Sequence, residues 1–255
     1  MFVIGCGFLV GLGVVQVAGA QGAVWPGDNG LATPDVSIRL SAFHSDGYLP
    51  AFTSAERKIS GGEGELSGWL DDRIYVNVRG DYRREIAISG AQDVGPGSLR
   101  LLTLANVWQG GVDIQLGWMG LVPFTRDHGE ILSDELDVHL LAGLSTDAGT
   151  ARLGLTGGMA ILGNPLRFAN QDDAPLLWLT AAVPASPRLS LSGRLGGALP
   201  TARNPSRLSS TLSATWGHSW QVGVAGEIGL TPAAADLGGR LWLGHCWGCT
   251  APRRD

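Results

Sequence analysis

The sequence predicts an all-β protein: an antiparallel up-and-down transmembrane β-barrel of about twelve strands that follows an N-terminal signal peptide. Three observations predict this fold class. Segments of about ten residues alternate between apolar and polar side chains, which is the pattern of a strand with two different faces. Tight turns and longer links alternate between these segments along the chain. An uncharged apolar run stands before the first of them.

The apolar run covers residues 1–20, which carry no charged side chain and end in the small residues Val17-Ala18-Gly19-Ala20. This pattern is typical of a secretory signal peptide with its cleavage site, although a basic first segment is missing. A membrane anchor is the alternative, but roughly 16 apolar residues are few for a bilayer-spanning helix. We therefore expect a signal peptide at 1–20, a flexible periplasmic lead-in at 21–33, the barrel at 34–247 and a C-terminal tail at 248–255.

The clearest hairpin is formed by residues 207–216 and 220–230, in which apolar and polar side chains alternate over both legs. A three-residue turn would set Trp216 opposite Trp220, with both apolar faces on the same side. Each leg has about the length that a tilted strand needs to cross a bilayer. We expect Trp216 and Trp220 to be interfacial aromatic residues at the membrane boundary. A hairpin of a soluble β-sandwich is the alternative.

The other strands follow from the same alternation. In order, they are predicted at 35–43, 61–70, 73–83, 98–108, 112–122, 135–144, 151–161, 175–183, 188–195 and 236–247. The facing of strand 98–108 stays open, because a two-residue and a three-residue turn after it give opposite answers.

The connections between the predicted strands are ordered. Every second one is a tight turn, and the others are links of about ten to fifteen residues, with 231–235 as the short exception. Outer-membrane barrels have such short periplasmic turns and longer external loops, whereas a soluble sandwich has no reason for this order. The expected location is therefore the outer membrane of a Gram-negative bacterium, reached by signal-dependent export.

The polar faces of the strands carry small polar residues and both signs of charge, which suits a wet lumen. Lys58 is the only lysine among 18 basic residues, whereas solvent-facing strands commonly use lysine. The net charge of -5 argues against a nucleic-acid partner. The expected lumen-lining residues are Arg79, Asp81, Asp113, Asp137, Arg152, Arg194, Glu227 and Arg240.

These lumen charges predict a passive channel or transporter for small solutes, with a weak anion preference. The preference follows because arginines outnumber carboxylates near mid-strand once Asp81 is set against Arg83. Two alternatives stay open: an outer-membrane barrel enzyme that acts on lipid, and a structural barrel whose lumen is closed by the same ion pairs. The expected partners are outer-membrane lipid and the barrel-assembly machinery.

Motifs for catalysis or metal binding are weak. The five histidines form no pattern with a serine or cysteine nucleophile, so no catalytic residue is assigned. Cys246 and Cys249 form a CxxC pair, but a metal site would need more ligands than the adjacent His245 provides. We expect a structural disulfide between them in an oxidising compartment, and no cofactor or metal.

One region resembles a known family. Val112–Trp118, Val122-Pro123-Phe124-Thr125, the acidic link after them and 135–144 resemble outer-membrane proteins of the MetA-pathway phenol-degradation type. Members show a Leu-Pro-Thr-Gly-like segment at a strand end, which is replaced here by Pro123-Phe124-Thr125-Arg126. The resemblance covers about 98–247 and implies a barrel that passes small, including aromatic, compounds. It assigns no functional residue. The chain also lacks the terminal aromatic residue of the usual assembly signal, because Trp247 is followed by 248–255.

Overall fold

The computed structural model describes residues 36–48, 57–71, 73–87, 89–124, 136–161, 173–201 and 206–247. The predicted signal peptide, lead-in and C-terminal tail lie outside these ranges. The strands are β1 (Val36–Tyr48), β2 (Arg57–Trp69), β3 (Ile74–Ala87), β4 (Gln92–Trp108), β5 (Asp113–Pro123), β6 (Asp137–Ala148), β7 (Ala151–Ile161), β8 (Ala174–Ser186), β9 (Leu189–Ala198), β10 (Arg207–Gly217), β11 (Trp220–Gly229) and β12 (Leu237–Trp247).

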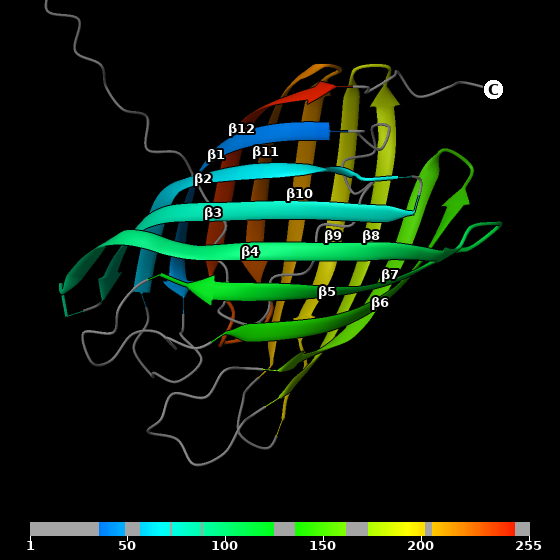
Figure 1. Ribbon diagram of the computed structural model, residues 1–255. Coiled ribbons are helices and arrows are strands. Elements are labelled where there is room, and N and C mark those ends of the chain that lie inside the picture. The colour runs from blue at the N-terminus through cyan, green and yellow to red at the C-terminus, as the bar shows by residue number, and fades with distance from the viewer. Residues whose placement is uncertain are drawn as a thin grey trace, which may run out of the picture.

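The strands form one closed barrel in which each pairs antiparallel with its neighbours in the chain. The barrel closes where β1 pairs with β12, from Val36 opposite Trp247 to Asp46 opposite Leu237. Figure 1 shows β2 to β5 crossing in front of the far wall that contains β9 to β11. The predicted fold class, an up-and-down barrel of twelve strands, is confirmed. Within the described ranges, no helix is long and apolar enough to cross a membrane.

The alternation of side chains decides which face of each strand points outward. On β11, Trp220, Val222 and Val224 are exposed, whereas Gln221 and Gly223 between them are buried. The same arrangement recurs around the barrel, so apolar residues cover the outside and most polar ones face the lumen. The exposed apolar side chains include Ile38, Leu40, Leu66, Val78, Leu101, Leu116, Leu140, Leu155, Leu179, Leu195, Leu212, Val224, Leu241 and Leu243.

This exposed apolar belt is the opposite of what water favours, because soluble proteins rarely expose apolar patches that extend this far. Strands of ten to seventeen residues are long enough to cross a bilayer. A closed barrel also leaves no unpaired strand edge, so every spanning strand satisfies its backbone hydrogen bonds within the sheet. The outer surface therefore fits the hydrocarbon core of a membrane.

Tight turns join the strands at the end of the barrel where β1 begins and β12 ends. They follow β2, β4, β6, β8 and β10, as predicted. The turn after β6 contains Gly149 at a φ of +65°, a left-handed conformation that glycine adopts without strain. After β2, the Asp71 carboxylate accepts hydrogen bonds at 2.7 Å from the backbone N–H groups of Arg73 and Ile74. We call this the turn end of the barrel and the opposite one the link end.

Three connections at the link end are shorter than predicted. The expected link 84–97 is wrong, because β3 and β4 continue through most of it and only 88–91 remain between them. The links after β1 and β9 shrink to 49–56 and 199–206 for the same reason. Beyond the membrane both faces of a strand meet water, so the apolar–polar alternation that marks a strand is lost. Arg84, for example, is exposed and donates to Gln92 Oε1 at 2.6 Å.

The predicted pairing of Trp216 with Trp220 is also wrong in register. Gly217 still belongs to β10 and pairs with Gln221, so Trp216 lies opposite Val222. The register differs from the predicted one by two residues, and such a shift leaves every side chain on the same face. Both tryptophans therefore stay on the outside, with exposed fractions of 56% and 65%.

Substituting an arginine into the middle of the outer face tests whether that face contacts lipid. Val224 lies at the centre of β11 with 47% of its surface exposed. We expect Val224→Arg to lower the free energy of unfolding by about 2–4 kcal/mol, because an outward charge at mid-bilayer is poorly solvated. Urea unfolding in lipid vesicles, followed by tryptophan fluorescence, measures the loss.

Val112→Arg is the matched control, because Val112 is equally exposed but lies in a tight turn at the membrane boundary. Its expected loss is about 0–1 kcal/mol. Equal losses for the two variants would contradict the assignment of this outer face to lipid.

Candidate functional site

Charged side chains gather on the part of the lumen formed by β12, β1, β2, β3 and β4. Alternation on β2 turns Glu63 and Glu65 inward and leaves Gly62 and Gly64 on the outside. Arginines on the neighbouring strands meet these carboxylates. The resulting ion-paired wall consists of Arg39, Arg57, Arg79, Arg83, Arg100 and Arg240 together with Glu63, Glu65, Asp81 and Glu85.

Glu63 is the centre of the ion-paired wall. Its carboxylate lies 2.8 Å from Arg240 Nη1, 2.8 Å from Arg79 Nε and 3.8 Å from Arg100 Nη1. Ser41 Oγ donates a further hydrogen bond to it at 3.2 Å. Only 2% of the Glu63 side chain is exposed, so these cations replace the water that a buried carboxylate would otherwise need. One carboxylate therefore holds arginines from three strands, β3, β4 and β12, in place.

The wall continues from Glu63 toward the link end. Arg100 Nη2 lies 3.6 Å from Asp81, Arg83 lies 3.7 Å from Asp81 and 2.8 Å from Glu85, and Arg57 lies 3.3 Å from Glu85. A bulge between β3 and β4 sets Asp81 against Ser98, whose N–H and Oγ both donate to its carboxylate. Six guanidinium groups thus meet four carboxylates, which leaves the wall with an excess of two positive charges.

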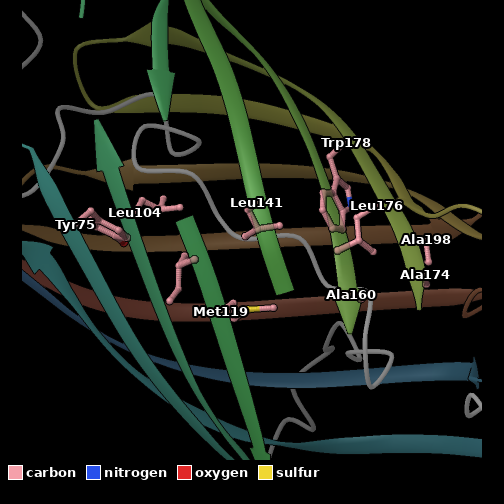
Figure 2. Close-up of a cluster of buried hydrophobic side chains, with 10 residues drawn as sticks. Tyr75, Leu104, Met119, Leu141, Ala160, Ala174, Leu176, Trp178 and Ala198 are labelled. Atoms are coloured by element: carbon pink, nitrogen blue, oxygen red, sulfur yellow. The ribbon is translucent and has the colours of Figure 1, made fainter. Parts of the chain in front are cut away.

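The lumen has a second, apolar part that the sequence analysis did not predict. Its buried side chains form one cluster on β3 to β9, which we call the apolar wall (Figure 2). Figure 2 shows Trp178 beside Leu176 on the same strand, with Leu141, Met119, Leu104 and Tyr75 following across the barrel wall. The cluster is Tyr75, Leu102, Leu104, Met119, Leu141, Ala160, Ala174, Leu176, Trp178 and Ala198.

Two inward glycines make room for the apolar wall. A Cβ atom at Gly117 would collide with the Leu104 side chain, and one at Gly158 would lie 2.9 Å from Leu141 Cδ2. Each leucine therefore lies over a neighbouring strand at the place where that strand has no side chain. The expectation of a lumen lined only by charged and small polar residues is corrected accordingly.

All eight predicted lumen residues lie on inward-facing strand positions. Arg79, Asp81 and Arg240 belong to the ion-paired wall. Near the turn end, Arg152 Nη2 donates to Asp113 Oδ2 at 2.8 Å, and Arg152 Nη1 lies 3.4 Å from Asp147. The remaining inward residues are Asp137, Arg194 and Glu227 on β6, β9 and β11. That these residues influence the passage of solutes stays a prediction.

The charge count behind the predicted anion preference has to be corrected. That count included Arg79 and Arg240 but left out Glu63, which pairs with both, and Glu65, which lies 3.3 Å from Arg79. The excess of arginine comes instead from the whole wall, including Arg39, Arg57 and Arg100, which were not predicted. The spacing Glu63-Gly64-Glu65 was the signal that could have placed two carboxylates on one face.

An aromatic group lies outside the barrel at the turn end. His245 stands between Trp220 and Trp247, with ring centroids 4.8 Å and 4.5 Å away. Together with exposed Trp216, these rings form a patch at the level where aromatic girdles meet the membrane boundary. The role of Trp216 and Trp220 as interfacial aromatics stays a prediction.

The C-terminal cysteines were expected to form a disulfide. Cys246 lies near the end of β12, is buried and is disulfide-bonded. Cys249 lies outside the described residues, so the pairing of these two cysteines stays a prediction. Among the described residues, no group of three or more His, Cys, Asp or Glu side chains is arranged to hold a metal ion.

Comparison with known proteins locates this barrel among outer-membrane proteins by fold. No protein-family model matches the chain, and no curated protein matches it. Among solved structures, the COG4313 outer membrane channel from Pseudomonas putida F1 matches with a TM-score of 0.68 and 16% identity, over 88% of this chain and 98% of that one. The barrel has the fold of an outer-membrane channel.

Two porins of similar topology also match. The KdgM porin gives a TM-score of 0.54 at 6% identity, over 83% of this chain and 99% of its own. The NanC porin gives 0.56 at 5% identity, over 83% of this chain and 98% of its own. At these identities the likeness concerns the fold, so the function must be argued from the lumen.

Proposed function

We propose that this protein is a passive channel of the bacterial outer membrane for small organic solutes. The observation that carries the proposal is the distribution of side chains, which is the reverse of that in a soluble protein: apolar residues lie outside and charged residues lie inside. Leucine, valine and tryptophan cover the outside, whereas ten charged side chains of the ion-paired wall line the inside. A closed wall with this distribution separates lipid from a polar interior, as in porins.

The net charge of the ion-paired wall supports a weak anion preference. Two guanidinium charges exceed the carboxylates there, and a narrow, low-dielectric lumen makes such an excess effective. The apolar wall gives the same lumen a second surface, which can contact the uncharged parts of a solute. This combination supports the narrower proposal of organic and aromatic solutes that the MetA-pathway resemblance implies.

The proposal includes the route to the membrane. We infer export through a signal peptide at residues 1–20 and insertion by the barrel-assembly machinery, with outer-membrane lipid as the partner of the exposed belt. A barrel enzyme acting on lipid and a closed structural barrel are the rival functions. The three solved structures compared above carry names of channels and porins, which supports the channel over these rivals.

Liposome swelling tests the passive route directly. Vesicles that contain the full-length protein are diluted into isotonic solutions of small neutral and anionic organic solutes of increasing size. A channel lets the smaller solutes enter, so these vesicles swell faster than protein-free ones. Insertion without any increase in swelling would support the closed barrel, and release of fatty acid from the vesicle lipid would support the enzyme.

Charge reversal at Arg152 tests whether the turn-end mouth influences ion selectivity. Arg152→Glu would place a third carboxylate beside Asp113 and Asp147. We expect the reversal potential in a salt gradient to move toward cations, less so as salt rises, because screening acts over about 10 Å at 0.1 M. The free energy of unfolding should change by less than about 1 kcal/mol, because the Arg152 side chain is 36% exposed. An unchanged reversal potential would remove Arg152 from the conducting path.

A further inference from the structure

Charged side chains on the outer face of the barrel are confined to one place. Within the described ranges, the Asp, Glu, Lys and Arg side chains at outward strand positions are Asp46 on β1, Lys58 on β2 and Arg84 on β3. These three strands are neighbours in the sheet (Figure 1). The rest of the outer face is apolar, as lipid requires, so charges on this face need a polar partner at the membrane.

The strand register brings the two cations together. Arg84 lies opposite Ser60, and Lys58 lies two residues further along β2, opposite Ile86. Lys58 and Arg84 are therefore diagonal neighbours on one face, about 7–8 Å apart at the backbone, which is within reach of long side chains. Ser60 points outward beside both and adds a hydroxyl group. We call Lys58, Ser60 and Arg84 the basic patch.

The basic patch presents donors to the outside of the barrel. Lys58 Nζ lies 2.9 Å from Asp46 Oδ1, yet the lysine side chain is 64% exposed, and an ammonium group has three donors. Arg84 is exposed as well and donates to Gln92 Oε1 at 2.6 Å with one of the five donors of its guanidinium. Asp46 also lies 3.4 Å from His44 Nε2. One carboxylate against two permanent cations leaves one positive charge in excess.

The basic patch lies at the height of a lipid headgroup. Gly68, near the turn end of β2, pairs with Val36, and Val36 lies opposite Trp247 in the aromatic group of the turn end. Lys58 precedes Gly68 by ten residues, which in a tilted strand rise roughly 25 Å along the barrel axis. This rise matches the apolar band of an outer-membrane barrel. The patch is therefore at the second membrane boundary, where headgroup phosphates lie.

We propose that Lys58, Ser60 and Arg84 bind the phosphate of a lipid in the leaflet at the link end. Two cations and a hydroxyl complement phosphate oxygens, and hydrogen bonds between charged groups are the strong ones. Short turns are periplasmic in outer-membrane barrels, so this lipid belongs to the external leaflet. The site rests on the proposed location in the outer membrane and names the lipid class, but it does not depend on conduction.

Glycines beside the basic patch leave room for an acyl chain of the bound lipid. From Ser60 toward the turn end, the next outward residues on β2 are Gly62 and Gly64. A Cβ atom at either glycine would meet no atom closer than 3.8 Å, so the surface there is open. Tyr82 lies opposite Gly62 and Leu40 opposite Gly64, with exposed fractions of 58% and 64%. A chain that descends from the patch into the membrane would pack against these two side chains.

Native mass spectrometry of the full-length protein in a non-ionic detergent tests the lipid site. The probes are lipid A with its phosphates, the same lipid without phosphate, and inorganic phosphate. We expect one copy of phosphorylated lipid A to bind at least about tenfold tighter than the dephosphorylated lipid. Inorganic phosphate at the same concentration should not displace it. Lys58→Gln and Arg84→Gln should each weaken its binding by about fivefold, the effect of one basic residue at an anionic lipid surface.

Two further variants separate lipid binding from a general loss of structure. Asp46→Asn removes the carboxylate that competes for Lys58, so it should strengthen the binding of lipid A by about two- to fivefold. Gly64→Leu fills the open surface below the patch and should weaken the binding by at least about threefold, through lost packing of the acyl chain.

The matched controls are Arg188→Gln, in the exposed turn after β8, and Gly226→Leu, on the outer face of β11. A Cβ atom at Gly226 would have no neighbour within 4 Å, so leucine fits there too. Both controls should bind lipid A like the unaltered protein. Equal binding of the two lipid forms, displacement by inorganic phosphate, or equal losses in controls and test variants would overturn the site. If Arg84→Gln does not fold, Lys58→Gln decides alone.

The lipid site and the channel can fail separately. Phosphate-dependent binding of lipid A by a barrel that causes no liposome swelling would preserve the site and overturn the channel. Swelling without phosphate-dependent binding would overturn the site and preserve the channel.

Discussion

Glu63→Gln should lower the free energy of unfolding by about 3–5 kcal/mol, because removing one partner leaves buried charge uncompensated. The lost carboxylate lies 2.8 Å from both Arg240 and Arg79, so two guanidinium groups lose their nearest counter-charge. The same substitution adds one positive charge to the lumen, so anion preference should rise. Urea unfolding in vesicles measures the first effect, and the reversal potential in a salt gradient measures the second.

Asp147→Asn is the control for Glu63→Gln. Asp147 also pairs with an arginine, but its side chain is 72% exposed at the turn end. Exposed pairs contribute little, so its loss should stay below about 1 kcal/mol. A Glu63 variant as stable as this control would show that the ion-paired wall does not depend on Glu63.

Trp178→Ala should both destabilise the barrel and widen its lumen. Trp178 is 3% exposed and is the largest side chain of the apolar wall. Its truncation should lower the free energy of unfolding by about 3–5 kcal/mol, since the apolar contacts are lost and a void remains. Because the indole fills part of the lumen, single-channel conductance should increase.

Trp216→Ala removes the same side chain from the outer face, where its exposed fraction is 56%. This control should leave single-channel conductance unchanged and cost less stability. If the Trp178 variant has unaltered conductance, the apolar wall does not narrow the conducting path.

The strands and their outward faces could be predicted because lipid and lumen demand opposite side chains. On 207–216 and 220–230 the two classes alternate at most positions, and the predicted strands agree with β10 and β11 to within one residue. A turn of the same length placed one residue later, enclosed by Gly217 and Gln221, shifts the register of the pair by two residues, and local alternation does not encode this placement. The register error at Trp216 therefore left both faces correct.

The ion-paired wall was only partly predictable. Glu63 and Glu65 lie in a glycine-rich segment that looks like a weak strand, yet glycine is acceptable there because the neighbouring strands supply the pairing. Which arginine meets which carboxylate depends on the register of five strands. Arg240, for example, reaches Glu63 only because β12 and β2 both lie beside β1.

The apolar wall could not be predicted from periodicity. Leu101-Leu102, Leu140-Leu141 and Leu176-Leu177 place leucine on both faces of their strands, so alternation disappears there. A continuous apolar run is compatible with either facing until the barrel closes. The structure shows that one leucine of each pair faces the lumen and the other faces outward.

Single-channel recording in planar bilayers tests the central claim that this barrel is a conducting channel with a cationic lumen. The purified full-length protein is added to one side, and current is recorded with equal salt and then with a salt gradient. We expect discrete conductance steps and a reversal potential displaced toward that of the anion, decreasing as salt concentration rises. Stable insertion with no conductance steps, or a reversal potential displaced toward the cation, would contradict the account.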